Sequence, residues 1–478
     1  MKIWGDAVLY LALEKEKKRS LAVQIFLQLR EKILRGELSA GERLPSSREL
    51  SEDLHISRNT VLTAYDMLGS EGFARSAPGA GVYVCEGVFK NPRPVLAAAD
   101  FYQPSLSPEK LPPDIINFDS GIPALDLFPR ARWNRAVTSS FLDAPASALG
   151  YDDPQGRPEL RETLAAYLRK SRGILCSPDQ IVITSGAKQG LTLIAKCLLD
   201  ENSEVLLEDP SNANVVKIFS YHTNRLTPVP VDREGIQTQC LPPDASPALI
   251  FLTPSHQFPM GGVLSIGRRL ELIRYARQSG CYLVEDDYDS EFRYGNVPVR
   301  SLFELDSERV IYVGTFSKVM FPSLRLGYLV LPYPLVAQCV EWKRLADHHS
   351  NSVYQLALVR FMEGGELERH IARMKKVYLK RRRELLEQLE TLFPEHFNVY
   401  GEESGMHFVA GFRDVSFSPD LVRRIREEGV YLVSVENHAM VKGAHTGEVL
   451  LGYAHLTREE MGRGLLTIKR CIEETRRE

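Results

Sequence analysis

Two short stretches, at residues 183–199 and 253–262, have residue types that can hold a phosphate and an aromatic ring. "ITSGAKQGLTLIAKCLL" passes from a strand-like run through residues 185–187 into a helical pattern. Backbone amides at a helix N-terminus, beside a glycine that permits close approach, can cradle a phosphate. "TPSHQFPMGG" places His256 and Gln257 in a loop directly after another strand-like run. Taken singly, a plain strand-to-helix turn and a structural histidine explain these stretches equally well.

An acidic strand end adds a titratable group. "YLVEDDYDSEF" ends an apolar run in Asp286, and Tyr288 follows two residues later. A buried carboxylate is costly without a cationic partner, so Asp286 predicts a positive group nearby. We interpret the adjacent Asp287 and Asp289 as solvated loop acids.

A lysine supplies a possible nucleophile. "VGTFSKVMFPSLRLGYLV", residues 313–330, contains Ser317, Lys318 and Arg325. A lysine that is partly desolvated near other cations loses proton affinity and becomes nucleophilic toward a carbonyl group. This stretch alone does not distinguish such a lysine from a surface one, so the choice depends on where the other stretches lie.

Residues 115–478 predict the elements that would bring these groups together. Strand-like runs alternate with amphipathic helical stretches, which is typical of a mostly parallel sheet covered by helices, an α/β fold. Ligands of open parallel sheets bind beyond the carboxyl ends of the strands, and all four stretches follow such ends. A phosphate cradle, an acid, an aromatic hydroxyl, a reactive lysine and an arginine are the groups that pyridoxal 5′-phosphate requires.

In order and approximate spacing these motifs, together with "YDDPQGRPELRETLAAYLRKSRG" at residues 151–173, resemble a fold-type-I, class I aminotransferase. The resemblance implies a large lobe at about 140–345 and a smaller C-terminal α+β lobe at about 346–478. It implies that Lys318 forms the internal aldimine with pyridoxal 5′-phosphate. It also implies that Asp286 keeps the pyridine nitrogen protonated.

The same resemblance assigns the remaining cofactor contacts. Tyr288 would hydrogen-bond the ring hydroxyl oxygen, with His256 or Gln257 nearby. The phosphate would be held by Ser185, Gly186, Ala187, Ser317 and Arg325. Tyr151 matches a tyrosine that reaches the phosphate of the neighbouring subunit, so we expect a homodimer with the site at its interface. No metal site is expected.

Residues 20–85 predict a small domain with a helix-turn-helix and a wing. "LPSSRELSEDLHISRNTVLTAYDMLGSEG" gives two capped helices, one starting near Ser46 or Ser47 and one after Ser57, with a tight turn at residues 55–56. Leu50, Leu54, Val61, Leu62, Ala64, Tyr65 and Leu68 would pack them together. "FARSAPGAGVYVC" predicts strand, Gly-rich turn and strand. A plain helical bundle is the alternative, because 12 Lys/Arg against 11 Asp/Glu over residues 1–85 give no broad basic footprint.

The order "LPSSREL…ISRNTV…GSEGF…GAGVYV" resembles the winged helix-turn-helix of the GntR family. The resemblance implies contacts with double-stranded operator DNA from Ser46, Arg48, Arg58, Asn59, Thr60, Gly79 and Gly81. A dimer would carry two of these DNA-binding domains, here called DNA readers, and they would contact two half-sites on the operator.

The remaining chain features indicate the compartment. Residues 86–114 hold six prolines and little periodicity, which predicts an extended linker. The seven cysteines are scattered and form no CxxC, as expected in a reducing cytoplasm. No run of 18 apolar residues predicts a membrane span, and the N-terminus does not read as a signal peptide.

The spacing of Asp286 and Tyr288 is D-x-Y, where many aminotransferases have D-x-x-Y. With "TPSHQFP", "GTFSK" and the fused reader, this variant resembles the MocR/GabR subfamily of bacterial transcription regulators, which typically pair head to tail. Two interpretations stay open. The chain is a regulator that senses an amine, an amino acid or pyridoxal phosphate itself through a Lys318 aldimine, or it is a working aminotransferase with a DNA-binding domain.

The groups that would select a substrate favour the regulator. A transaminase clamps its substrate carboxylate, usually with an arginine. "GEVLLGYAHL" puts Glu448 near that place, and "EDPSNANVV" puts Asn212 and Asn214 where the GABA-responsive branch carries Tyr and Arg. We therefore expect neither GABA recognition nor ordinary transamination. His438, Lys442 and His445 are weak candidate substitutes for this clamp, and we favour the interpretation that they are solvated loop residues.

Overall fold

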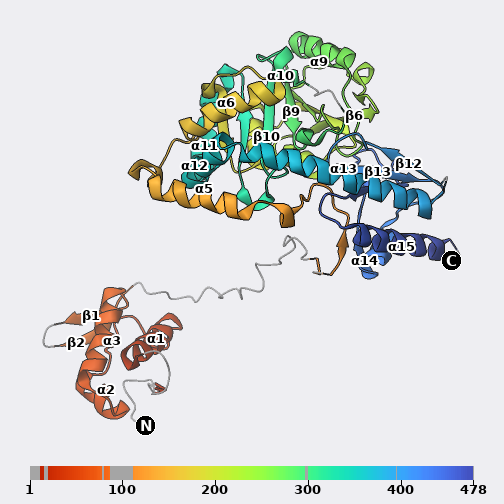
Figure 1. Ribbon diagram of the computed structural model, residues 1–478. Helices are drawn as coiled ribbons and strands as arrows, with labels where there is room; N and C mark the ends of the chain where they lie inside the picture. The colour runs from red at the N-terminus through yellow and green to blue at the C-terminus, as the bar shows by residue number, and fades with distance from the viewer. Residues whose placement is uncertain are drawn as a thin grey trace. The chain divides into compact units, whose positions relative to one another are not determined.

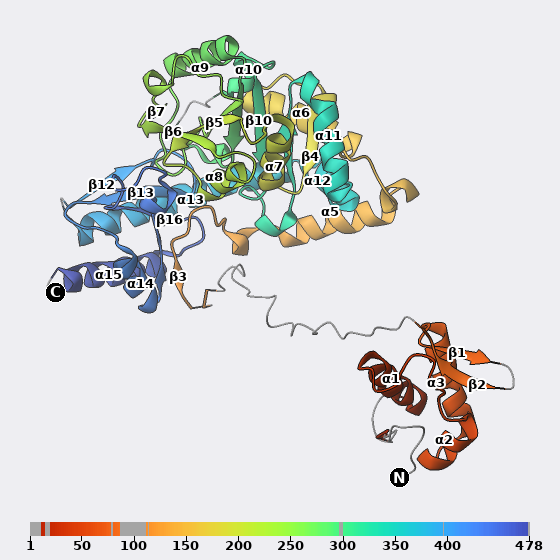
Figure 2. The same cartoon turned by 180° about the vertical axis from the view of Figure 1, so that it is seen from behind.

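The computed structural model describes residues 11–14, 20–77, 80–86, 111–112, 114–295, 300–394 and 396–476. It divides into two compact units, Met1–Lys110 and Leu111–Glu478, each described here by itself (Figures 1 and 2). Gly79 of the predicted wing and nearly all of the predicted linker lie outside the described residues. The domain and lobe boundaries expected from the sequence stay predictions.

The first unit is a winged helix-turn-helix. Its elements are α1 (Leu21–Leu34), α2 (Ser47–Leu54), α3 (Arg58–Ser70), β1 (Ala74–Ala77) and β2 (Gly81–Val84). Ser46 caps α2 in a capping box with Glu49, and Ser57 caps α3 by accepting from the Thr60 amide. His55 takes a left-handed conformation at φ 52° and makes the turn between them. The strands β1 and β2 pair antiparallel as the wing.

One apolar cluster holds this unit together. Ile25 and Leu29 of α1 and Val61 and Leu68 of α3 are fully buried in it. Leu62 was expected in this core and is instead 40% exposed. The reason is geometric, because adjacent helical residues point about 100° apart and Val61 already faces the core.

An eight-stranded sheet forms the centre of the second unit. Its order is β4 (Ile181–Thr184), β11 (Gly327–Val330), β10 (Val310–Thr315), β9 (Tyr282–Asp287), β8 (Leu249–Leu252), β5 (Glu204–Asp209), β6 (Arg225–Asp232) and β7 (Gly235–Ile236). Neighbours from β10 to β6 are parallel, while β11 runs antiparallel to β10 and β4. The predicted mostly parallel sheet is therefore confirmed.

Helices cover both faces of this sheet because its strands are apolar on both sides. In β10, Ile311 and Val313 pack on one face and Val310 and Tyr312 on the other. The first face is covered by α7 (Ala187–Leu198), α8 (Ala213–Ser220) and α11 (Tyr333–Asp347), seen in front in Figure 2. The second face packs against α6 (Pro158–Arg172), α9 (Ile266–Ser279), α10 (Leu302–Leu305), α12 (Ser352–Glu363) and α13 (Glu366–Leu392). Helix α5 (Arg130–Asp143) packs on α12.

A smaller antiparallel sheet follows α13 in the chain. Its order is β12 (Phe397–Tyr400), β13 (His407–Phe412), β16 (Glu448–Gly452) and β15 (Val433–Ser434), with α14 (Pro419–Glu427) and α15 (Arg458–Thr475) packed nearby. Strand β3 (Ile116–Asn117) pairs in parallel with β14 (Val430–Tyr431). Residues 116–121 thus connect this lobe to the large sheet.

Short 3-10 turns link these elements: η1 (Leu125–Leu127), η2 (Ala146–Leu149), η3 (Pro178–Gln180), η4 (Thr238–Cys240), η5 (Ser290–Phe292), η6 (Pro322–Leu324) and η7 (Val435–His438). Among the described residues, no helix is both long and apolar enough to cross a membrane.

Candidate functional site

Lys318 follows the carboxyl end of β10 and points at the segment that leads in from β3. Its Nζ donates a 2.7 Å hydrogen bond to the carbonyl oxygen of Gly121. Burial lowers the pKa of Lys318, while Asp289 and Asp119 act against that shift. A lysine amine with reduced proton affinity is a suitable nucleophile for an aldehyde.

Asp286 lies on the neighbouring strand β9, in register with Val313 of β10. Burial raises the pKa of Asp286 to about 7, and the adjacent Asp287 adds to the shift. Its Oδ1 is buried without a hydrogen-bond partner in the described part of the chain. An unsatisfied buried carboxylate beside a cavity fits the protonated ring nitrogen of pyridoxal phosphate, which supplies both a donor and a positive charge.

The turn from β4 to α7 forms the phosphate cradle. Gly186 has φ +94°, and a Cβ there would lie 3.0 Å from Nη2 of Arg325. Arg325 Nη2 donates to the carbonyl oxygen of Ser185. No side chain caps the start of α7 at Gly186, so its first amides are available to an anion. Ser317 is oriented by Thr315, whose Oγ1 donates to its hydroxyl oxygen at 3.1 Å.

A cavity of about 270 Å³ brings the predicted groups together. The predicted residues that line it are Ala187, Asp286, Tyr288, Ser317, Lys318 and Arg325. Ser185 and Gly186 adjoin it through Arg325. An anion cradle, an orphaned carboxylate, a phenol and a lysine of reduced proton affinity on one cavity match the phosphate, ring nitrogen, ring hydroxyl and aldehyde of the cofactor.

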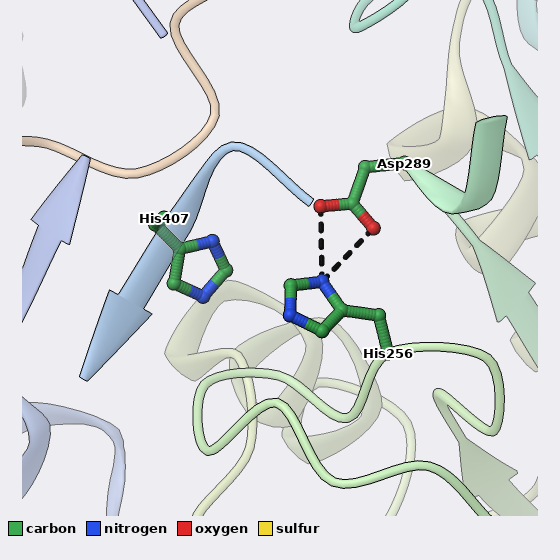
Figure 3. A group of neighbouring side chains, drawn as sticks. All are labelled: His256, Asp289 and His407. Atoms are coloured by element: carbon green, nitrogen blue, oxygen red, sulfur yellow. Dashed lines mark hydrogen bonds and ion pairs between the residues drawn. The ribbon is translucent and has the colours of Figure 1, made fainter. Parts of the chain in front are cut away.

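Tyr288, which would face the ring hydroxyl of the cofactor, is positioned by a hydrogen bond to the backbone of His256. The Tyr288 hydroxyl donates to the carbonyl oxygen of His256 at 3.0 Å. Burial raises the pKa of Tyr288, and Asp289 adds to the shift, so the phenol keeps its proton. His256 Nδ1 lies 3.0 Å from Asp289 Oδ2 (Figure 3).

The two acids expected to be solvated are buried, so that expectation was wrong. Asp289 is 1% exposed and pairs with His256. Asp287 is 8% exposed, pairs with Arg172 and accepts from the Tyr312 hydroxyl at 2.6 Å. Each has a partner that is distant in the chain and offsets part of the cost of burying its charge.

Besides Ser185 and Gly186, three predicted cofactor residues do not line the cavity: His256, Gln257 and Tyr151. The Gln257 side chain donates to the carbonyl oxygens of Pro210 and Phe258 at 2.9 and 2.7 Å and accepts from the Met260 amide at 3.0 Å. Its amide therefore holds the loop together. Tyr151 is 88% exposed, with its ring 4.8 Å from that of His348. Its role toward a neighbouring subunit stays a prediction.

Two amide side chains and a second lysine also line the cavity. Asn212, Asn214 and Lys188 line it, and Arg325 is the one arginine among its described lining residues. Glu448 is not among them, and its Oε2 lies 2.6 Å from His445 Nδ1.

Of the three side chains expected to be solvated near Glu448, Lys442 is exposed as expected, whereas His438 and His445 are partly buried against protein partners. His438 packs edge-on against Phe258 at 5.0 Å, and burial lowers its pKa to about 4. Lys442 Nζ donates to the carbonyl oxygen of Glu436 at 2.7 Å, and His445 pairs with Glu448.

The predicted DNA-contacting residues gather at the start of α2 and α3. Arg48, Arg58 and Asn59 are exposed. Arg58 Nε donates to Ser47 Oγ at 3.0 Å, which links the two helix starts. Ser46 is the N-cap residue of α2, and the Thr60 amide donates to Ser57, the N-cap of α3; whether Ser46 and Thr60 also contact DNA stays a prediction. Gly81 is the first residue of the wing strand β2.

Sequence reasoning missed several site residues. Arg43 lies beside the wing, with its Nε 2.9 Å from where a Cβ on Gly81 would be. Gly121 and Asp119 act on Lys318, and the only signal was an Asp-Ser-Gly turn after a short strand. Lys188 could have been noticed as a cation two residues after the cradle glycine.

The fold and the site define a transcription regulator made of a GntR-type DNA reader and an aminotransferase-like domain whose cofactor is pyridoxal phosphate. The family model "Aminotransferase class I and II" matches residues 113–468, and "Bacterial regulatory proteins, gntR family" matches residues 21–84. The chain belongs to the MocR/GabR type of these regulators, and GntR-type readers bind operator DNA.

Individual relatives agree with both halves. The chain is 31% identical to the "Probable rhizopine catabolism regulatory protein MocR" of Rhizobium meliloti, over 96% of this chain and 95% of that protein. It is 32% identical to the "HTH-type pyridoxine biosynthesis transcriptional regulator PdxR" of Corynebacterium glutamicum, over 79% and 80%. The alpha-aminoadipate aminotransferase LysN of Thermus thermophilus, solved with N-(5'-phosphopyridoxyl)-L-leucine, matches 76% of this chain and 93% of its own at 29% identity and a TM-score of 0.70.

Proposed function

We propose that the pyridoxal phosphate site of this regulator senses a primary amine or amino acid and does not carry out steady transamination. One observation carries the proposal. The cofactor groups are complete around Lys318, while Arg325 is the one arginine among the described residues of the cavity. Since Arg325 is committed to the phosphate cradle, no described arginine is left to clamp a substrate carboxylate.

The cofactor supplies an aldehyde that a lysine or an effector amine can engage, on a ring that withdraws electrons. The protein's part is to place Lys318 at that aldehyde. The Gly121 carbonyl oxygen accepts a hydrogen bond from the lysine Nζ. Asp286 holds the ring nitrogen, and the Gly186 turn with Arg325 fixes the phosphate. When Lys318 is not engaged by the cofactor, its Nζ would donate to the Gly121 carbonyl oxygen, as it does in this structure.

Gly121 offers a route by which this exchange can reach the small lobe. It lies four residues after β3, which pairs with β14 of that lobe. The Phe118 amide donates to Tyr431 O at 2.8 Å, and the Gly452 amide donates to Phe118 O at 2.8 Å. A change at Lys318 therefore shifts a segment anchored on two strands of the small lobe. The predicted linker directly precedes this segment and would pass the shift to the DNA reader.

The assembly we propose is a head-to-tail homodimer that places two readers on two half-sites. Its support is the exposure of large apolar side chains on and near α5, namely Phe141 at 58%, Leu142 at 76% and Leu149 at 59%, next to the exposed Tyr151. Exposed apolar patches of this kind mark protein interfaces. Because the reader acts on operator DNA, the protein works in the bacterial cytoplasm.

A second candidate is that pyridoxal phosphate itself is the signal and its binding to Lys318 is the sensing event. The similarity to a regulator named for pyridoxine biosynthesis favours it. Under this candidate, operator affinity differs between cofactor-free and cofactor-loaded protein and does not respond to added amines.

Three measurements on purified protein test the proposal. The loaded protein should absorb in the visible region, and Lys318→Ala should lose that band; a wild type without the band refutes the cofactor site. D- and L-amino acids, dipeptides and ω-amino acids are then screened for changes in the band. Any amine that changes it should also change operator affinity without producing a keto acid. Steady keto-acid production would contradict the proposal and favour an aminotransferase with a DNA-binding domain.

A further inference from the structure

A buried hydrogen-bonded group lies behind the tyrosine of the cofactor cavity. His256 Nδ1 is 3.0 Å from Asp289 Oδ2 and 3.1 Å from the Tyr288 hydroxyl oxygen. His256 and Asp289 are 2% and 1% exposed. Figure 3 shows Nδ1 of His256 facing both carboxylate oxygens of Asp289, with His407 beyond the opposite edge of the ring. The proposed function uses Tyr288 but gives no role to Asp289.

The position of one proton links these three residues. A carboxylate only accepts hydrogen bonds, so its pairing with Asp289 places a proton on Nδ1 of His256. With that proton in place, Tyr288 cannot donate to Nδ1, and its own proton goes to the His256 carbonyl oxygen or into the cavity. Without it, Nδ1 would compete for the Tyr288 proton. Which nitrogen of a histidine ring carries the proton is set by the hydrogen bonds that the two ring nitrogens make.

The surroundings favour a hydrogen-bonded pair over a bound metal ion, although two histidines and a carboxylate are suitable metal ligands. Burial lowers the pKa of His407 to about 3, and the positive charge of Lys318 contributes to that shift. The same positive charge would repel a cation held by this group. His407 Nε2 lies 3.3 Å from the carbonyl oxygen of Pro259, which gives its proton a partner.

We infer that Asp289 is a positioning residue: it fixes the Nδ1–H tautomer of His256 and so leaves the Tyr288 hydroxyl free to donate to the ring oxygen of the cofactor. This inference rests on the proposed placement of pyridoxal phosphate and adds the residue that orients its phenol partner.

Two effects of Asp289 on the Lys318 nitrogen have opposite signs. Its negative charge raises the proton affinity of that nitrogen more than any other neighbour does. The Tyr288 hydrogen bond lowers the proton affinity, because it stabilises negative charge on the ring oxygen beside the nitrogen. The other charged groups facing Lys318 are Asp119, Asp286 and Lys188, and Tyr294 and Tyr453 also face Asp289. None of these is changed in the variants below.

The test is the pH midpoint of the visible band in cofactor-loaded protein. Tyr288→Phe should raise the midpoint by about one pH unit. An asparagine can donate to Nδ1, where the carboxylate only accepts. Asp289→Asn removes a negative charge, which lowers the midpoint, and frees Nδ1 to compete for the Tyr288 proton, which raises it. In the Tyr288→Phe background only the charge effect remains, so Asp289→Asn should lower the midpoint there and should lower it less, or raise it, when Tyr288 is present. Shifts on Asp289→Asn that are equal with and without Tyr288 would overturn the inference.

Asp306→Asn is the matched control. Asp306 is also a buried, ion-paired aspartate at 4% exposure, but it precedes β10 at the end of the strand away from the cavity. The pH midpoint of the visible band in Asp306→Asn should equal that of wild type. Thermal unfolding of every variant separates loss of fold from the shift in midpoint.

A measurement on cofactor-free protein tests the tautomer itself. Ring-nitrogen NMR, with the His256 signals assigned by their loss in His256→Gln, should show a proton on Nδ1 in wild type. In Asp289→Asn a part of the population should move to Nε2. A wild-type proton on Nε2 would refute the inference even if the cofactor binds. An absent visible band in wild type would refute the proposed function and leave this measurement valid.

Discussion

Lys318 Nζ donates its hydrogen bond to Gly121 O across 197 residues of sequence, at 2.7 Å. The contact joins the reactive lysine to a segment that pairs with the small lobe through β3 and β14. It is the structural link on which the proposed signalling depends.

Gly121→Ala should weaken cofactor binding. Gly121 has φ +80°, and a Cβ there would lie 2.4 Å from Lys318 Nζ. The variant thus combines backbone strain with a clash at the lysine, and we expect a loss in affinity of about tenfold or more, measured by titrating the visible band. Gly280→Ala is the matched control, because Gly280 also has φ +80° but nothing within 4 Å of its Cβ position. Equal affinities in the two variants would contradict the role of the contact.

Arg325→Ala should discriminate between phosphorylated and unphosphorylated forms of the cofactor. Arg325 lies against the Gly186 turn, where we place the phosphate. Loss of a charge-assisted hydrogen bond costs about 2 kcal/mol, so affinity for pyridoxal phosphate should fall roughly 30-fold while that for pyridoxal changes little. Binding is followed by the visible band. A similar loss for both ligands would mean that Arg325 does not contact the phosphate.

The cofactor-free protein should lose stability as pH rises. The pKa of Asp286 is raised from 3.8 to about 7 in the fold, so between these values the folded state binds more protons than the unfolded one. Stability is then fully present below the unfolded pKa and declines, by about 1.4 kcal/mol per pH unit, up to the folded pKa. Asp286→Asn removes this contribution and should be more stable than wild type at pH 8 but not at pH 4.

Urea unfolding of both cofactor-free proteins from pH 4 to pH 8 measures the difference. Burial raises the pKa of Glu208 to about 7 as well. The free energy of unfolding of the variant therefore still falls with pH by the amount that Glu208 contributes. If the free energies of unfolding of wild type and variant change in parallel with pH, the pH dependence does not come from Asp286.

Arg58→Ala should weaken operator binding without affecting the cofactor. Arg58 is exposed at the start of α3 and is oriented by Ser47. Losing a base or phosphate contact there costs about 1–3 kcal/mol, or roughly 5- to 160-fold in affinity. Duplexes selected from a random library by wild type serve as the operator. Arg35→Ala, which removes an exposed arginine at the C-cap of α1 that pairs with Glu31, should bind normally.

Much of the site could be predicted because its chemistry sits at strand ends. Asp286 and Lys318 each follow a continuous apolar run, and parallel strands carry such ends to one edge of the sheet. The helix-turn-helix was predictable for a similar local reason, since Ser46 and Ser57 mark helix starts directly.

The rest of the site could not be predicted from the sequence, because it depends on contacts between residues that are far apart in the chain. Asp287 and Asp289 were expected in solvent because nothing adjacent to them neutralises their charge. Arg172 and His256, which pair with them, lie 115 and 33 residues away. Gln257 shows the converse, because a polar residue in the right loop can be used entirely for holding that loop.

The most direct test of the account compares operator-binding curves of cofactor-free and cofactor-loaded wild type with those of Lys318→Ala, with and without an amine that changes the visible band. The account predicts that in wild type the amine shifts operator affinity by about 5- to 100-fold, the usual size of coupling between two sites. It predicts no such shift in Lys318→Ala. Superimposable curves for wild type in all conditions would contradict it.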